Sequence, residues 1–174
     1  MIPRLRAALL LLAVPSVLAA CSSSAPAATE PGTLHGPYPV VRSVDGDTIR
    51  VDRDGEEIAV RFIGLDTPET VAADRPVECF GPEASARTAA LVEGGQVWLE
   101  YDEASGLTDK YDRTLAFVWL DQQTMLNELL IREGFAEEVT YTDGYAHQSD
   151  FRAAEDAARN AGAGLWTACA GEVQ

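Results

Sequence analysis

Histidine and cysteine are scarce in this chain of 174 residues, which has two histidines, His35 and His147, and three cysteines. No two cysteines stand in a Cys-x-x-Cys spacing. Zinc sites in proteins take three or four ligands, drawn mainly from these two residue types. The sequence therefore excludes the usual Cys/His zinc clusters and any site that needs several imidazoles.

Basic residues are also few, since 13 Lys and Arg stand against 28 Asp and Glu and the net charge is −15. Proteins that hold nucleic acid by a broad basic face do so because Lys and Arg neutralise phosphates. The composition argues against such a face. A function directed at phosphates would need a few concentrated cations or a metal ion.

No apolar run is long enough to span a bilayer as a permanent helix, but the N-terminus forms a targeting segment. Two arginines precede an apolar stretch over residues 7–14, and Leu-Ala-Ala-Cys stands at 18–21. The last four residues resemble a bacterial lipobox. They predict a lipoprotein signal peptide over residues 1–20, cleavage before Cys21 and acylation of the Cys21 thiol. An ordinary signal peptide with an incidental cysteine is the alternative.

Export sets the expectations for location, charge and the remaining cysteines. The mature chain is expected outside the cytoplasm, lipid-anchored to the cell membrane through Cys21. Cleavage would remove two arginines and no acid, which lowers the net charge from −15 to −17. With Cys21 acylated, Cys79 and Cys169 are an even remainder, which favours a disulfide in an exported chain. Two free thiols are the alternative.

The composition changes once after the leader. Residues 21–37 are rich in Ser, Ala, Pro and Gly, lack periodicity, and predict a flexible tether. Residues 38–170 then form one domain, which is the number of domains that the chain length favours.

Within the domain, periodicity predicts strands first and helices later. Alternating apolar residues and turn signals predict five strands, and helical spacing with Gly or Pro boundaries predicts three helices. The expected strands cover residues 38–44, 48–51, 57–65, 96–101 and 115–120, and the expected helices cover 81–93, 125–132 and 148–160. This order predicts an α+β fold, a five-stranded OB-fold β-barrel with three helices.

Acidic residues end two of the expected strands. Asp45 and Asp47 flank a glycine between two strand segments, and Asp66 follows the apolar run Phe-Ile-Gly-Leu. If these turns meet at one end of the barrel, their carboxylates and the Thr67 carbonyl offer the hard oxygen ligands that Ca²⁺ takes. Taken alone, Asp-Gly-Asp is equally an ordinary turn.

Two further charged residues belong to the same stretch. Glu69 follows a proline that stiffens the turn after Asp66, so its carboxylate could orient or deprotonate a water near a metal, although it could also be a surface acid. Arg61 lies among alternating core residues, where a charge needs a partner or a function. A guanidinium matches a phosphate bidentately.

Five sequence blocks, in order and spacing, resemble the staphylococcal nuclease (thermonuclease) family over roughly residues 38–166. The blocks are VDGDT at 44–48, RFIGLDTPET at 61–70, FGPEAS at 80–85, TDKYDRTLAF at 108–117 and LNELLIREGFA at 126–136. The family fold, a five-stranded OB barrel with three helices, is similar to the one predicted from periodicity.

The resemblance implies a calcium site and a general base. By it, Asp47, Asp66 and the Thr67 carbonyl bind Ca²⁺, and Asp45 lies just outside these ligands and holds a metal-bound water. Glu69 looks like the base that positions the attacking water.

The resemblance also implies contacts with the substrate. Arg61 and Arg113 are similar to the two arginines that hold the scissile phosphate, and Lys110 and Tyr111 to the pair that contacts the neighbouring phosphate. Tyr141 is the best candidate to flank the base. Asp112 departs from the family, which has glycine at this position, but Asp tolerates positive φ better than most residues.

The resemblance, together with the lipobox, implies a monomeric, calcium-dependent, lipid-anchored nuclease that hydrolyses phosphodiester bonds of DNA and RNA and leaves 3′-phosphate ends. One alternative is a catalytically inactive nucleic-acid- or calcium-binding module on the same fold. Such modules usually lose the catalytic acids and arginines, whereas this chain has them all. Another alternative, an acidic calcium-binding envelope protein, does not explain Arg61 or Arg113.

Overall fold

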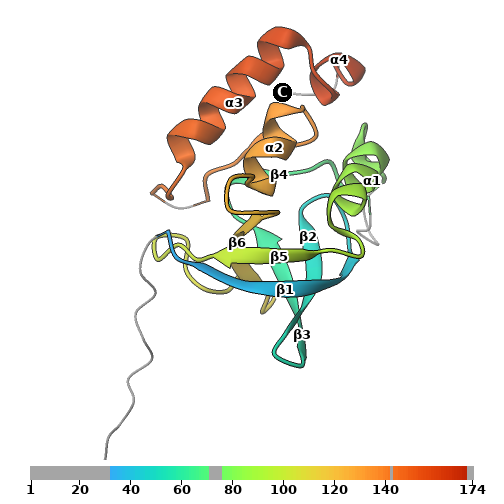
Figure 1. The fold of residues 1–174 in the computed structure, drawn as a ribbon. Coiled ribbons are helices and arrows are strands. Elements are labelled where there is room, and N and C mark those ends of the chain that lie inside the picture. The colour runs from blue at the N-terminus through green and yellow to red at the C-terminus, as the bar shows by residue number, and fades with distance from the viewer. Residues whose placement is uncertain (1–31, 71–75, 142, 172–174) are drawn as a thin grey trace, which may run out of the picture.

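Five strands close into a barrel in the order β1-β2-β3-β6-β5 in the computed structural model, which describes residues 32–70, 76–141 and 143–171 (Figure 1). Strand β3 pairs with β6 in parallel, and the other neighbours are antiparallel. The strands are β1 Leu34–Ser43, β2 Thr48–Arg53, β3 Glu56–Phe62, β5 Gln96–Glu100 and β6 Thr114–Trp119. The barrel confirms the predicted α+β OB-type fold.

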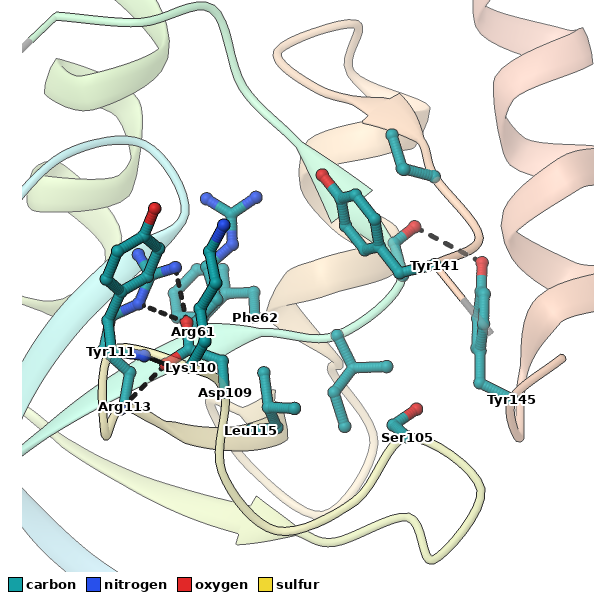
Figure 2. Close-up of a pocket in the computed structure, with 13 residues that line it drawn as sticks. Arg61, Phe62, Ser105, Asp109, Lys110, Tyr111, Arg113, Leu115, Tyr141 and Tyr145 are labelled. Atoms are coloured by element: carbon teal, nitrogen blue, oxygen red, sulfur yellow. Dashed lines mark hydrogen bonds and ion pairs between the residues drawn. The ribbon is translucent and has the colours of Figure 1, made fainter. Parts of the chain in front are cut away.

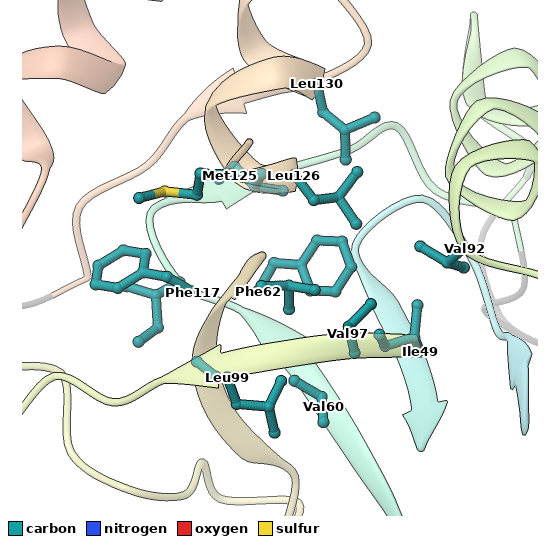
Figure 3. Close-up of a cluster of buried hydrophobic side chains, with 14 of the residues drawn as sticks. Ile49, Val60, Phe62, Val92, Val97, Leu99, Phe117, Met125, Leu126 and Leu130 are labelled. Carbon is teal, nitrogen blue, oxygen red and sulfur yellow. The ribbon is translucent and has the colours of Figure 1, made fainter. Parts of the chain in front are cut away.

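Alternation along β2 and β3 builds the core, because every second side chain points into the barrel. Ile49 and Val51 of β2 and Val60 of β3 are fully buried. Figure 3 shows this interior covered by Leu126 and Leu130 of α2, which are also fully buried. Burying one such side chain stabilises the fold by about 1.5–3 kcal/mol.

Of the four helices in the described part of the chain, three match the predicted ones, and they cover one end of the barrel (Figure 1). They are α1 Gly81–Val92, α2 Leu126–Arg132 and α3 Gln148–Ala161, and the short α4 Leu165–Ala168 was not predicted. Helix α3 packs on α2 and buries Phe151, Ala154 and Ala158. Among the described residues, none of the helices has the length and apolar content to cross a membrane.

The strand predicted over residues 57–65 is wrong beyond Phe62. The chain turns at Gly64, whose φ is +79°, and resumes as β4 Leu65–Asp66, which pairs with β7 Glu137–Glu138 in a separate small sheet. Glycine is required here because a Cβ would lie 2.7 Å from the Tyr145 ring. The turn carries Asp66 away from the barrel and toward the segment after α2.

Strand β1 begins at Leu34, before the expected start of the domain at Tyr38. Leu34 pairs with Glu100 and His35 with Leu99. Gly36 and Pro37 predicted a linker, but they lie where the β1–β5 register shifts, so the ladder continues past them. The expected signal peptide, Cys21 and most of the tether lie outside the described residues.

A disulfide joins Cys79 to Cys169, as predicted, across a sequence separation of 90 residues. It links the segment before α1 to the end of α4. For a loop of this size the chain-entropy estimate gives a stabilisation of roughly 3–5 kcal/mol.

A second link between barrel and helices is the pair of Glu100, at the end of β5, and His147, just before α3. Glu100 Oε1 lies 3.1 Å from His147 Nε2, and Trp119 Nε1 donates to Glu100 Oε2 at 2.8 Å. The hydrogen bond to Glu100 raises the pKa of His147 and outweighs burial, while Asp150 and Asp102 add to the rise. Burial raises the pKa of Glu100, but the hydrogen bonds from His147 and Trp119 leave it below its ordinary value.

The two shifts predict how stability depends on pH. His147 contributes fully below its unfolded pKa of 6.5, and its contribution is lost as pH rises through the raised folded pKa. Glu100 contributes to stability above its unfolded pKa of 4.5, and that contribution is lost as pH falls through its lowered folded pKa.

His147→Gln should therefore lower the free energy of unfolding more at about pH 6 than at about pH 9, measured by urea denaturation. In a Glu100→Gln background this difference between pH values should shrink; an unchanged difference would show that the ion pair is not its source.

Candidate functional site

A tight loop at residues 45–47 places the first carboxylates. A Cβ on Gly46 would lie 2.5 Å from Thr67 Oγ1, so only glycine allows the two segments to approach this closely. On its other side, Thr88 of α1 donates its hydroxyl to the Gly46 carbonyl at 2.6 Å. The loop is thus fixed between α1 and the segment after β4.

Asp47 is the buried centre of the site, with 3% of its surface exposed. Its Oδ1 accepts a hydrogen bond from Thr48 Oγ1 at 3.0 Å. Its Oδ2 accepts from the Thr67 backbone N–H at 3.2 Å and from Thr67 Oγ1 at 3.1 Å. A buried carboxylate needs this number of donors, and they fix its orientation.

Arg61 joins two of the predicted carboxylates. Its guanidinium forms ion pairs with Asp47 Oδ1 and with Asp66 Oδ1. Burial lowers the pKa of Arg61, but the Asp47 and Asp66 carboxylates outweigh burial and raise it. The side chain comes from the end of β3, where Arg61 is paired with Thr48 in the ladder.

Asp45 adds negative charge beside this cluster. Its Oδ1 accepts the Asp47 backbone N–H at 3.1 Å, which closes the turn. Burial, followed by the Asp47 carboxylate, raises the pKa of Asp45 to about 7. Carboxylates are therefore crowded at this end of the barrel, as the two Asp-bearing turns predicted.

The donor set fits a hard divalent cation that also takes water or substrate oxygens. The Asp47 and Asp66 carboxylates both contact the Arg61 guanidinium, and the Thr67 N–H and hydroxyl donate to Asp47, so two carboxylates and the Thr67 segment meet at one place. Within the described ranges, no three His, Cys, Asp or Glu residues form a metal-binding group of their own. Arg61 pairs with the carboxylate oxygens that such a cation would take.

Glu69 lies beyond Pro68 in a turn that is held from two sides. Its Oε1 accepts the Thr70 backbone N–H at 2.8 Å. The start of α1 packs against the turn, because a Cβ on Gly81 would lie 2.9 Å from the Glu69 carbonyl oxygen. Glu69 is not among the described residues that line the adjacent pocket.

Arg113 is held by an acidic residue that the sequence analysis missed. Its Nε donates to Asp109 Oδ2 at 2.7 Å, and Asp109 Oδ1 accepts the backbone N–H groups of Tyr111 and Arg113. Burial raises the pKa of Asp109, but these hydrogen bonds outweigh it and leave the pKa below its ordinary value. Asp112 has a φ of 62°, which confirms that it accepts the conformation for which the family uses glycine.

A pocket of about 470 Å³ brings the predicted substrate-binding residues together (Figure 2). In this view Lys110 and Tyr111 stand on one side and Tyr141 on the other. Tyr111 and Tyr141 are 67% and 72% exposed, so both rings are accessible. The Lys110 Nζ lies 4.9 Å from the centre of the Tyr111 ring.

The structure connects the two groups of predicted residues through Thr48. The Thr48 hydroxyl donates to Asp47 and accepts from Arg113 Nη1 at 3.4 Å, so the carboxylate cluster and the pocket are neighbours. The predicted residues that line the pocket are Arg61, Lys110, Tyr111, Arg113 and Tyr141. Cys21 lies outside the described residues.

Besides Asp109, three residues near the site are not predicted from the sequence: Thr48, Glu78 and Tyr145. Tyr145 lines the pocket, and its hydroxyl donates to Glu138 Oε1 at 2.8 Å. Only Asp109 had a local signal, since an acid that opens a turn commonly accepts the backbone N–H groups that follow it. Thr48 and Tyr145 also contact Arg113 and the Gly64 carbonyl, which lie far away in the chain, and such pairs leave no local pattern.

Comparison with known proteins gives the same family as the sequence blocks. Residues 59–168 match the family model described as staphylococcal nuclease homologue. The thermonuclease of Staphylococcus hyicus is 42% identical over 130 residues, which are 75% of each chain, and that of Staphylococcus intermedius is 40% identical over 129 residues, 74% of this chain and 75% of the relative. Endonuclease YncB of Bacillus subtilis is 35% identical over 127 residues, 72% of this chain and 59% of that protein. The chain belongs to the staphylococcal nuclease family.

Proposed function

We propose that the protein is a calcium-dependent nuclease that hydrolyses phosphodiester bonds of DNA and RNA and leaves 3′-phosphate ends. The observation that carries the proposal is that Arg61 and Arg113 line one pocket beside the buried Asp47 carboxylate. The thermonuclease and endonuclease relatives support it.

The two arginines would stabilise the charge that develops on phosphorus. A water oxygen bonds to phosphorus, the bond from phosphorus to the 5′ oxygen breaks, and the products are a 3′-phosphate and a 5′-hydroxyl. Each guanidinium can donate two parallel hydrogen bonds to the phosphate oxygens, which a lysine cannot do. Donors fixed in advance at such oxygens are usually the largest contribution to catalysis.

Asp109 and Thr48 prepare Arg113 for this role. They contact the guanidinium at Nε, Nη2 and Nη1, so its plane is fixed at the pocket that Arg113 lines. Fixing the group in advance reduces the entropy that substrate binding must offset. Lys110 would contact the neighbouring phosphate, and the exposed Tyr111 and Tyr141 rings offer faces for the bases.

Glu69 would act as the general base and take the proton from the attacking water. Asp47, Asp66 and the Thr67 carbonyl would hold Ca²⁺, and Asp45 would orient a water beside it. When bound, the ion supplies positive charge to the phosphate oxygens. Arg61 would then exchange its carboxylate partners for the phosphate.

We propose further that the protein is exported and lipid-anchored to the membrane through Cys21. The arginines, apolar stretch and Leu-Ala-Ala-Cys sequence at 18–21 support this proposal.

The function is tested by incubating the purified domain with plasmid DNA and with RNA, in Ca²⁺ or in a chelator. Ca²⁺ should give fragments with 3′-phosphate ends, and the chelator should abolish cleavage. Asp66→Asn should raise the Ca²⁺ concentration needed for half-maximal rate, because one anionic ligand is lost. If the wild-type domain binds Ca²⁺ but cuts neither polymer, it is an inactive binding module.

Glu69→Gln keeps the size of the side chain but removes its ability to take a proton. The rate constant kcat should fall by about 10²–10⁴, measured on single-stranded DNA at saturating Ca²⁺. Glu83→Gln, which makes the same charge change on the exposed first turn of α1, should leave kcat unchanged. A folded Glu69→Gln variant with wild-type kcat would refute the general-base role.

Cys21→Ser should release the protein from the membrane fraction or leave it unprocessed, because the acylated thiol is gone. The measurement is membrane fractionation together with fatty-acid labelling of the full chain. A wild-type mature chain that is soluble and begins at another residue would contradict the anchor.

A further inference from the structure

Two glutamates close the segment between β4 and α1. The Glu69 backbone N–H donates to Glu78 Oε2 at 2.9 Å, and the Glu78 backbone N–H donates to the Glu69 carbonyl at 2.9 Å. Glu78 thus holds both backbone polar groups of Glu69. The carboxylate of Glu69 is oriented in turn by the Thr70 N–H.

The segment that carries Glu78 is exposed to solvent. Residues 76–78 are exposed and have no regular secondary structure, and Val77 is 59% exposed. Such a segment opens easily unless a neighbouring group anchors it. Glu78 can therefore fix Glu69 only to the extent that Glu78 is itself fixed.

The anchor is the next residue, Cys79, through its disulfide to Cys169. Cys169 is 4% exposed, and its backbone N–H donates to the carbonyl of the fully buried Leu165 at 2.8 Å. Leu165 donates in turn to the Gly134 carbonyl at 2.9 Å. The disulfide therefore ties an exposed segment to a well-packed part of the fold. Helix α4 lies on the same side of the molecule as α1 (Figure 1).

We infer that Glu78 is a positioning residue for the base Glu69, and that the Cys79–Cys169 disulfide holds Glu78 in place, so that turnover depends on an intact disulfide. The inference rests on the proposed function, because it assigns Glu69 its role there. A general base must lie within hydrogen-bonding reach of its water, and a displacement of about 1 Å can cost up to about 10²-fold in rate. The segment before α1 controls such a displacement, although Glu78 and Cys79 do not touch the substrate.

The first test removes the acceptor at Glu78. Glu78→Ala should lower kcat about 10-fold and leave both KM and the Ca²⁺ concentration for half-maximal rate unchanged, because Arg61, Arg113 and Asp66 stay in place. Glu78→Gln keeps an acceptor oxygen for the Glu69 N–H and should recover most of the rate. Glu83→Ala is the matched control for loss of one exposed acidic charge before or within α1, and should have no effect.

The second test opens the disulfide. A phosphine reduces the disulfide to two thiols: it supplies two electrons, water supplies two protons, and the oxygen of that water ends on the phosphine as phosphine oxide. Reduction of the folded wild type should lower kcat by the same factor, about 10-fold. Cys79→Ser/Cys169→Ser should behave in the same way at temperatures where circular dichroism shows it to be folded. Should that variant not fold, reduction of the wild type at low temperature and Glu78→Ala still test the inference.

The effects of Glu78→Ala and of disulfide reduction on kcat should not be independent of each other. Because Glu78 and the disulfide act on Glu69 in series, reduction of Glu78→Ala should cost little further rate, whereas independent effects would multiply. In Glu69→Gln, reduction should leave the residual rate unchanged, because no base remains to be positioned.

The outcomes distinguish this inference from the proposed function. If the oxidised wild type cuts nucleic acid with Ca²⁺ but keeps its kcat after reduction or in Glu78→Ala, the positioning role is refuted and the nuclease stands. A change confined to KM, or multiplying effects of reduction and Glu78→Ala, would also refute it. If the oxidised wild type cuts nothing, the proposed function fails first.

Discussion

The buried carboxylate of Asp47 is the group on which the rest of the site depends. Its two oxygens accept hydrogen bonds from Thr48 and Thr67, and Oδ1 also forms an ion pair with Arg61. The carboxylate thus joins the start of β2, the end of β3 and the segment after β4. Removing one member of a buried pair leaves the other charge without compensation, which costs about 3–5 kcal/mol. The same carboxylate therefore holds the barrel end together and, under the proposed function, would present ligand oxygens, so a change at Asp47 is expected to affect stability and metal binding at once. Asp66, which is exposed, separates the two effects better.

Arg61 neutralises this carboxylate cluster in the structure, and a metal ion would do so under the proposed function. In the structure its guanidinium neutralises part of the charge of Asp47 and Asp66, which keeps the crowded carboxylates compatible with folding. Under the proposed function, a divalent cation would take over that neutralisation, and the guanidinium would then be available for a phosphate in the pocket that it already lines. The pairing of Arg61 with carboxylates is thus consistent with a phosphate-binding role, because substrate and cation would arrive together at one charge cluster.

The sequence predicted the parts of this fold that depend on local pattern. Alternation along residues 48–62 and helical spacing along α1 and α3 are set by neighbours in the chain, and both predictions are confirmed. The break at Gly64 was missed because its cause is the approach of Tyr145, far along the chain. Glu78 was missed for a different reason: its partner Glu69 is near in the chain, but an exposed acid has no pattern that reveals its partner. Family resemblance supplied what periodicity could not, the likeness of Arg61 and Arg113 to one pair, and the structure shows that they line the same pocket.

The acidic character of the chain determines how a phosphate substrate can be recognised. On the helices, basic residues are paired with carboxylates, as in Arg87 with Glu133, Arg132 with Glu128 and Arg152 with Glu138, so their fields largely cancel. At physiological ionic strength charges are screened beyond about 8 Å. Attraction of a polyanion must then come from contact within the pocket, where Arg61, Lys110 and Arg113 are gathered. Positions of a few atoms matter more in such a site than net charge does, because long-range steering contributes little. A rigid scaffold for those atoms, from the Asp47 cluster on one side and the disulfide-anchored segment before α1 on the other, is what an acidic nuclease of this kind requires.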